Sequence, residues 1–309
     1  MPQQLFDRWI VVDWSAAATP KRGKDSIWIA DLAADGLHVD NPRTRIDAME
    51  LLADRVRAGA ARGERMLASF DFPFGYPAGA AASVFGAAPG RRGWHHVWAS
   101  LADSLEEGAR NANNRFVLAA RLNAAFGPVG PFWGRPAQRV LANLPATRPS
   151  GYGNVLPSER RLAERRVKRA QPVWKLAYTG SVGSQALTGI AALERLRRQP
   201  DITAKVWPFE TGLDLSPVAP GTVILAEIYP SLVDPAVRSS NDAIKDRAQV
   251  SLLATAFSAL DRARDLGPLF ALEGADLTAE ERDRVVEEEG WILGAGFEDR
   301  LLDALQPNA

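Results

Sequence analysis

The sequence has 309 residues, 46% of them hydrophobic and 24% charged, and its 37 Lys and Arg residues equal its 37 Asp and Glu residues in number. This composition is typical of a globular protein with a substantial core, and the balanced charge indicates no general affinity for polyanions. The chain has no cysteine, which excludes disulfides and thiolate zinc sites and is typical of the reducing cytosol. The N-terminus carries no signal-peptide pattern, and no uncharged apolar run reaches the roughly 18 residues of a membrane span. We therefore expect a cytoplasmic protein without a membrane partner.

Residues 8 to 71 predict three strands, a helix and a fourth strand. Apolar residues run without interruption from Trp9 to Val12, a pattern typical of a buried strand. The dipeptide Asp35-Gly36 indicates a hairpin turn, and apolar residues at helical spacing follow it. The expected elements are strands at 8–13, 26–31 and 37–39, a helix at 44–61 and a strand at 66–71. This order predicts a sheet in which three hairpin-linked strands are followed, after a crossover helix, by a parallel strand.

Residues 72–173 are rich in Pro, Gly, Trp and Arg and show no strand pattern. We expect helices at 95–109 and 115–126, and loops at 128–136 and 144–157. Since structureless connections of this length are rare inside compact domains, the segment is predicted to be an elaborate insertion made mostly of helices and loops.

Regular patterns return after residue 183, where apolar residues again recur at helical or strand spacing. The expected elements are a helix at 184–198, strands at 204–207 and 222–227, helices at 246–266 and 279–289, and a short edge strand at 291–293. The whole pattern predicts an α/β protein, with a mixed sheet of antiparallel and parallel strands flanked by helices. We interpret residues 1–309 as a single domain, with the insertion 72–173 between the fourth core strand and the next core helix.

Four acidic residues stand at the ends of these elements. Asp13, Asp71 and Glu227 close predicted strands, and Asp246 opens a predicted helix. Carboxylates are the hard oxygen ligands that Mg²⁺ and Mn²⁺ prefer, and such metals assist phosphoryl transfer. We interpret the four acids as a shared metal-binding cluster. The alternative is that each acid separately ends a strand, forms a turn or stabilises a helix N-terminus.

Six motifs sharpen this interpretation. They are Val12-Asp13-Trp14-Ser15-Ala16, Asp71-Phe72-Pro73-Phe74-Gly75, Gly130-Pro131-Phe132-Trp133-Gly134, Gly180-Ser181-Val182-Gly183-Ser184-Gln185, Val206-Trp207-Pro208-Phe209-Glu210-Thr211-Gly212 and Ala226-Glu227-Ile228-Tyr229-Pro230-Ser231. Together they resemble a bacterial family of uncharacterised proteins described as predicted nucleases with a ribonuclease H-like fold, and the resemblance spans nearly the whole chain. It implies a ribonuclease H-like sheet whose acids, Asp13, Asp71, Glu227 and Asp246, are catalytic ligands of Mg²⁺ or Mn²⁺ for the hydrolysis of nucleic-acid phosphodiester bonds. Gln249 stands where related proteins often carry a further acid.

Eight further residues are candidates for binding substrate or phosphate. They are Ser15, Arg115, Lys175, Gly180, Ser181, Gly183, Ser184 and Gln249. The run Gly180–Ser184 leads directly into a predicted helix, whose first backbone N–H groups bind anions; ordinary capping by Ser181 or Ser184 is the alternative. Ser15 lies near enough to Asp13 to orient a water or a phosphate oxygen, and the alternative is a turn hydroxyl.

Charge is unevenly spread along the chain. Residues 135–175 contain ten Lys or Arg and two acids, whereas residues 273–303 contain eleven acids and three Arg. The basic segment is either a surface that contacts nucleic acid or a solvated helix face.

Two other functions fit the same sequence. Actin-like kinases share the ribonuclease H-like core and bind ATP, with Gly180–Ser184 as the candidate phosphate loop here, but the first loop lacks their Asp-x-Gly-x-Thr pattern. A metabolic or binding protein for a small anion suits the neutral charge balance better than a nuclease does. The sequence leaves the substrate and the oligomeric state open.

Overall fold

The computed structural model describes residues 4–88, 92–127, 129–167, 169–215 and 217–306. Its contacts divide the chain into two compact units. Unit 1 comprises Met1–Asp71, Leu196–Asp276 and Ile292–Ala309, and unit 2 comprises Phe72–Arg195 and Leu277–Trp291. Unit 2 begins where the predicted insertion begins and extends beyond it. In the described ranges, no helix has both the length and the hydropathy that crossing a membrane requires.

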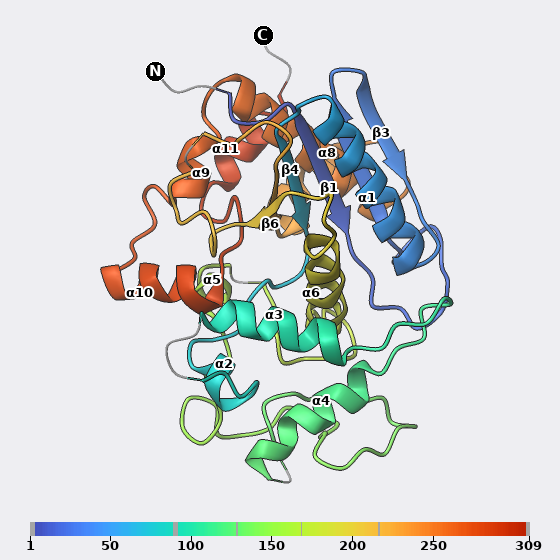
Figure 1. Cartoon of the computed structure of the whole chain (residues 1–309), viewed down its shortest axis with the longest axis vertical. Helices are drawn as coiled ribbons and strands as arrows, with labels where there is room; N and C mark the ends of the chain where they lie inside the picture. The colour runs from blue at the N-terminus through green and yellow to red at the C-terminus, as the bar shows by residue number, and fades with distance from the viewer. Residues whose placement is uncertain (1–3, 89–91, 128, 168, 216, 307–309) are drawn as a thin grey trace. The chain divides into compact units, whose positions relative to one another are not determined.

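Unit 1 is built on a six-stranded mixed sheet (Figure 1). Its strands are β1 (Arg8–Asp13), β2 (Trp28–Ala33), β3 (Gly36–Asp40), β4 (Met66–Phe70), β5 (Ala204–Val206) and β6 (Val223–Glu227). The order across the sheet is β3-β2-β1-β4-β6-β5. β2 pairs antiparallel with β1 and with β3, whereas the pairs β1–β4, β4–β6 and β6–β5 are parallel. The predicted α/β class with a mixed sheet is therefore confirmed.

Helices and short helical turns complete unit 1. They are α1 (Arg45–Ala61), η2 (Pro230–Val233), α7 (Asp234–Ser239), α8 (Lys245–Arg262), α9 (Gly267–Ala271) and α11 (Glu298–Asp303). α1 begins after Thr44 because the Thr44 side chain accepts a hydrogen bond from the backbone N of Asp47 at 3.1 Å, which caps the helix.

The two faces of β1 meet different helices. Trp9 and Asp13 share one face, because alternate side chains of a strand point the same way. α8 covers this face, and the guanidinium group of Arg262 lies 5.8 Å from the centre of the Trp9 ring. Arg8 points to the other face, where its Nη1 donates to the backbone O of Arg55 in α1 at 3.4 Å.

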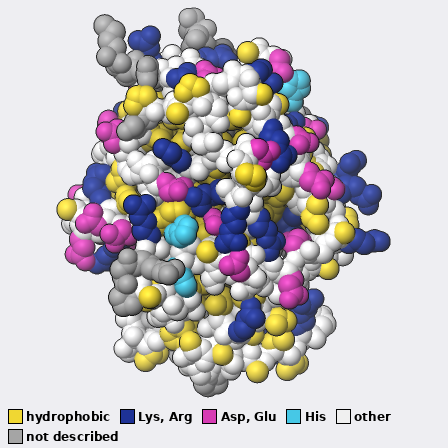
Figure 2. Space-filling model, viewed as in Figure 1, with side chains coloured by type: hydrophobic (Ala, Val, Ile, Leu, Met, Phe, Trp, Pro, Cys, Tyr) yellow, Lys and Arg dark blue, Asp and Glu magenta, His cyan; other side chains and the backbone are white. Residues whose placement is uncertain are grey.

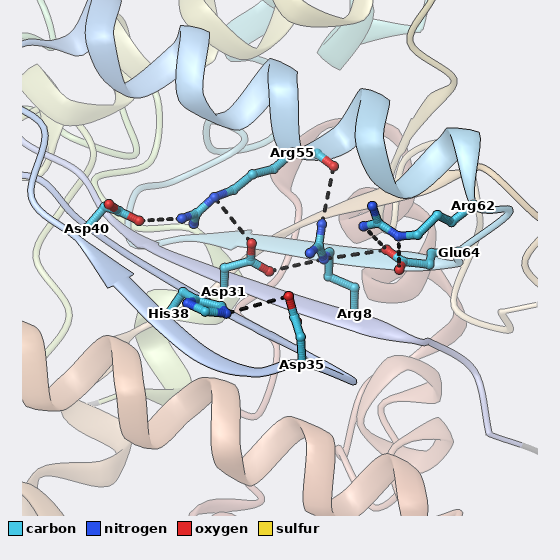
Figure 3. Close-up of polar contacts among 8 residues, drawn as sticks. All are labelled: Arg8, Asp31, Asp35, His38, Asp40, Arg55, Arg62 and Glu64. Atoms are coloured by element: carbon cyan, nitrogen blue, oxygen red, sulfur yellow. Dashed lines mark hydrogen bonds and ion pairs between the residues drawn. The ribbon is translucent and has the colours of Figure 1, made fainter.

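A network of charged side chains, buried at its centre, ties α1 to the sheet (Figure 3). Asp31 of β2 lies 3.2 Å from Arg8 Nε and 3.2 Å from Arg55 Nε. Arg55 also pairs with Asp40, and Arg8 lies 3.5 Å from Glu64. Burial raises the pKa of Asp31, and the charges of the two arginines oppose this rise. Opposite charges thus alternate through the network.

The described residues of unit 2 form helices and loops, as predicted for the insertion. The elements are α2 (Ala80–Ser83), α3 (Gly93–Ser104), α4 (Arg115–Asn123), η1 (Ala124–Phe126), α5 (Leu162–Arg166), α6 (Gly183–Arg197, the last two residues counted in unit 1), α10 (Ala279–Arg284) and η3 (Val285–Glu289). The core of unit 2 is aromatic: the Tyr76 ring lies 4.9 Å from that of Phe85 and 5.1 Å from that of Trp174. Gly75 allows η3 to approach, because a Cβ there would lie 2.2 Å from the backbone O of Glu288.

Most predicted elements differ in extent by a few residues, and the helix predicted at 95–109 is α3 (Gly93–Ser104). β2 begins later than predicted, because the Asn41 side chain donates to the Ser26 hydroxyl and to the Ile27 carbonyl and holds both residues in a loop. α8 ends earlier than predicted, since Arg264 adopts a left-handed backbone conformation with φ +64°. Residues 291–293 join β6 through an isolated bridge rather than as a strand.

Candidate functional site

The first two of the four predicted acids lie side by side. β1 and β4 are apolar runs that pair in parallel, with Val12 opposite Phe70. The next residue on each is an acid, Asp13 or Asp71, and the backbone N of Asp71 donates to Val12 O at 3.3 Å. Parallel pairing places such neighbours on the same face of the sheet. Both residues are half-buried.

The carboxyl groups of Asp13 and Asp71 hydrogen-bond to each other. Two carboxyl groups can do so only when one of them is protonated. Burial raises the pKa of Asp13 well above its usual value, and the charge of Asp71 raises it further. Burial also raises the pKa of Asp71, to about 6. Hydrogen bonds from Asp13 and from the backbone N of Trp14 act in the opposite direction and lower it. The Asp13–Asp71 pair therefore holds one shared proton.

Asp246 adds a third carboxylate from α8. It stands in the first turn of this helix, where the helix dipole favours an acid. Its Oδ2 accepts a hydrogen bond from the backbone N of Asp25 at 2.7 Å. The charges of Asp246 and Asp25 both raise the pKa of Asp13. This end of the sheet therefore concentrates negative charge around Asp13.

Glu227 lies at the same end of the sheet as Asp13 and Asp71, but its position in the strand register differs from theirs. It is opposite Phe70, which is in turn opposite Val12. Residues opposite one another in parallel strands point to one face, and the residues that follow them point to the other. Glu227 is buried, and the register directs it to the face that Val12 shares. The register thus places Glu227 and Asp13 on different faces of the sheet.

The predicted phosphate-binding loop belongs to unit 2, and its polar groups bind one another. The Ser184 hydroxyl donates to Leu176 O at 2.6 Å and accepts from Arg115 Nε at 3.0 Å. Lys175 Nζ donates to the backbone O of Thr179 at 2.7 Å. These three side chains therefore help to fix the shape of the loop that precedes α6.

The two glycines of this loop have a similar structural explanation. Gly180 has a φ of +73°, which favours glycine. A Cβ on Gly183 would lie 2.3 Å from Val173 O, so glycine permits this close approach. The backbone N of Ser181 donates to Tyr178 O at 3.0 Å. A phosphate-binding role for the loop stays a prediction.

Ser15 and Gln249, both in unit 1, make local contacts. The Ser15 hydroxyl accepts from the backbone N of Ala17 at 3.3 Å, and Arg45 Nη1 donates to Ser15 O at 2.9 Å. The buried Gln249 side chain donates through Nε2 to Asp234 Oδ1 at 3.1 Å. The Ser15 hydroxyl therefore binds the backbone of its own loop, and Gln249 links α8 to α7; a role for either residue in binding substrate stays a prediction.

The basic segment 135–175 lies in unit 2 and is unevenly exposed. Arg161 is fully buried and pairs with Glu164 at 2.8 Å. The exposed basic residues of the segment are Arg139, Arg148, Arg165, Arg166 and Arg169, whereas Lys168 lies outside the described residues. Arg148 pairs with Glu159 at 2.6 Å. Contact between this segment and nucleic acid stays a prediction.

Sequence reasoning missed the loop that joins β1 to β2 and its acid, Asp25. A signal for this loop was present, since Lys21, Arg22 and Lys24 follow closely on the strand that ends at Asp13. The connection of Asp25 to Asp246 had no comparable signal, because the two residues are far apart in the sequence.

In the part of the chain that the structure describes, no group of three or more His, Cys, Asp or Glu side chains is arranged so that it could hold a metal ion. The metal-binding role of the four acids therefore stays a prediction. Comparison with known proteins finds no family model, no curated protein and no solved structure that matches this chain.

Proposed function

We propose that this protein is a Mg²⁺- or Mn²⁺-dependent hydrolase of nucleic-acid phosphodiester bonds, with Asp13, Asp71 and Asp246 as its metal-binding acids. One observation carries the proposal. Asp13 and Asp71 share a proton at the carboxyl ends of adjacent parallel strands, and the charge of Asp246 acts on both. A divalent cation would take the place of this proton, because it neutralises several carboxylates at once.

The donor chemistry suits a hard cation, since all three groups are carboxylates, and metal binding would require the three to be rearranged from their positions in the described structure. The resemblance to ribonuclease H-like nucleases supports the same proposal, because it implies acids on the first strand, on a later core strand and on a C-terminal helix. When bound, Mg²⁺ supplies electrostatic stabilisation to the phosphate oxygens on which charge develops.

Backbone groups of the chain orient two of these acids. The N–H of Trp14 donates to Asp71 Oδ1 at 2.6 Å, and the N–H of Asp25 donates to Asp246 Oδ2 at 2.7 Å. A backbone N–H positions a carboxylate and leaves its negative charge in place. A lysine or arginine at the same position would cancel that charge. The proton between Asp13 and Asp71 must leave before both can bind a cation.

The test is cleavage of end-labelled RNA, DNA and branched DNA in Mg²⁺ or Mn²⁺. The Asp13→Asn variant keeps the shape of the side chain and can still donate a hydrogen bond to Asp71, but it is no longer a carboxylate. We expect it to lose more activity than the roughly 100-fold that follows loss of an outer-shell partner of a metal site.

Glu227→Gln is the matched control, because it neutralises an acid at the same end of the sheet but on the other face. It should cleave like the wild type, with folding of both variants checked by circular dichroism. Equal cleavage by the wild type and Asp13→Asn would contradict the proposal. So would a loss confined to Glu227→Gln.

A further inference from the structure

Both ends of the segment from Trp14 to Asp25, called the β1–β2 loop below, are tied to acids of the candidate site. At its start, the backbone N of Trp14 donates to Asp71 Oδ1 at 2.6 Å. At its end, the backbone N of Asp25 donates to Asp246 Oδ2 at 2.7 Å. The loop therefore leaves the site and returns to it, and its position is coupled to those two carboxylates.

The middle of the β1–β2 loop has a fixed shape. Gly23 has a φ of +82°, and its N–H donates to Asn41 Oδ1 at 2.7 Å. Its carbonyl accepts from the Ser26 hydroxyl at 2.6 Å and from Trp28 Nε1 at 3.0 Å. The backbone N of Lys21 donates to the backbone O of a neighbouring arginine, Arg43, at 3.0 Å. A loop held at this many points presents its side chains in a defined arrangement.

The side chains presented by the loop and its neighbour are basic. Lys21, Arg22, Lys24 and Arg43 are all exposed. Among the described residues, Arg22, Lys24 and Arg43 form no ion pair, and Lys21 lies 3.6 Å from Asp25. Figure 2 shows Lys and Arg side chains projecting from the right-hand edge of the molecule, on the side where Figure 1 draws this loop.

Several other arginines of unit 1 are neutralised by acids. Arg65 pairs with Asp7 at 2.8 Å, and Arg247 pairs with Asp242 at 2.8 Å. The basic group on the loop is different, because its positive charges are left available next to an acidic site. Such an arrangement suits a polymer that is negatively charged along its length and whose phosphodiester bond must enter the acidic site.

We propose that the β1–β2 loop binds the phosphate backbone of a nucleic acid, through Lys21, Arg22 and Lys24 with Arg43 beside them. The inference rests on the proposed function for the identity of the polymer, and it assigns the backbone contacts to unit 1 rather than to the basic segment 135–175. These contacts would position the nucleic acid without recognising its base sequence, since they reach phosphates and not base edges.

The experiment measures equilibrium binding of a fluorescein-labelled oligonucleotide in EDTA, over a range of salt concentrations. The probe is used as single-stranded DNA, as duplex DNA and as RNA, each in two unrelated sequences. The double variant Arg22→Ala/Lys24→Ala should reduce the slope of log K against log salt by about 2, because each phosphate contact contributes about one unit. The loss should be the same for both sequences.

The matched control is Arg165→Ala/Arg166→Ala, which removes two exposed arginines of the basic segment. It should leave the slope unchanged. If the control lowers the slope and the loop variant does not, the inference is overturned, while cleavage assays on Asp13→Asn still decide the proposed function. Wild-type protein that binds none of the probes also overturns the inference.

A second pair of variants tests how the loop is anchored. Asp246→Asn keeps an oxygen that can accept the hydrogen bond from the backbone N of Asp25, whereas Asp246→Ala does not. Both remove the same charge, so comparing them isolates the hydrogen bond. We expect Asp246→Ala to bind the oligonucleotides more weakly than Asp246→Asn in EDTA. Equal binding by the two would show that the anchor does not position the loop and would overturn that part of the inference.

Discussion

The sheet holds two acids in opposite electrostatic settings, Asp31 of β2 beside the first half of β1 and Asp13 at the end of β1. Asp31 lies between Arg8 and Arg55, whose charges oppose the rise of its pKa on burial (Figure 3). The strongest charges acting on Asp13 come from other acids, and they raise its pKa further. The first arrangement is neutralised within the protein and holds the fold together. The second arrangement keeps an excess of acids, which is the arrangement that a cation-binding site requires.

The largest expected effect on stability is at the neutralised acid, Asp31. Asp31→Asn leaves the buried Arg8 and the half-buried Arg55 without a carboxylate between them, and removing one partner of a buried ion pair costs about 3–5 kcal/mol. Urea unfolding measures this loss. Asp40→Asn is the control, because the Asp40 side chain is 45% exposed and an exposed pair contributes at most about 1 kcal/mol. Similar losses in the two variants would remove the distinction between a buried and an exposed pair.

The second effect on stability is the stabilisation of the folded protein by Mg²⁺ bound at the acidic end of β1, around Asp13. Mg²⁺ at about 100 times its Kd should stabilise the wild type by about 2.7 kcal/mol. Thermal unfolding with and without Mg²⁺ measures this shift. Asp31→Asn should retain the shift, since it lies outside the site, and Asp13→Asn should lose it. An undiminished shift in Asp13→Asn would show that Mg²⁺ binds elsewhere.

A third effect, similar in size to the second, is the dependence of stability on pH in the absence of metal. In the unfolded chain Asp71 loses its proton near pH 3.8, whereas in the folded protein its pKa is raised to about 6. The folded state therefore binds more protons in this window, and its free energy of unfolding falls as pH rises, by up to about 1.4 kcal/mol per pH unit for each proton.

The pKa of Asp13 is also raised well above 3.8, so the comparison of wild type with Asp13→Asn isolates the contribution of Asp13, while Asp71 is present in both proteins. Other acids have a pKa lowered by an ion pair, such as Asp7 beside Arg65, and their effect on stability has the opposite sign. The variant cannot share a proton between two carboxyl groups, so its free energy of unfolding should fall less between pH 3.8 and pH 6. Parallel pH profiles for the two proteins would contradict a shared proton at the site.

Much of the fold was predictable because its elements are encoded locally. The apolar run that ends at Asp13 and the one that ends before Asp71 form β1 and β4, and the helix after Thr44 begins at the cap that its sequence indicates. One boundary that failed was set by a partner from another part of the chain. β2 starts late because the side chain of Asn41 binds residues ahead of it.

The candidate site shows the same division. The sequence alone identified Asp13, Asp71 and Asp246 as acids at the ends of elements, because a change from apolar to charged residues is visible locally. Only the tertiary structure decided which of them meet. The register of β6 against β4 directs Glu227 to the other face, and a shift of one residue would have reversed that outcome.

The same reason explains why the sequence did not point to the β1–β2 loop as part of the site. Its basic residues are plain in the sequence, but its place depends on hydrogen bonds to Asp71 and Asp246, which belong to distant parts of the chain. The sequence by itself determined the α/β class and the residue types available for chemistry, because both follow from local patterns of apolar and charged residues. Strand register and loop anchoring were decided by tertiary structure, because they depend on pairings between residues that no local pattern specifies.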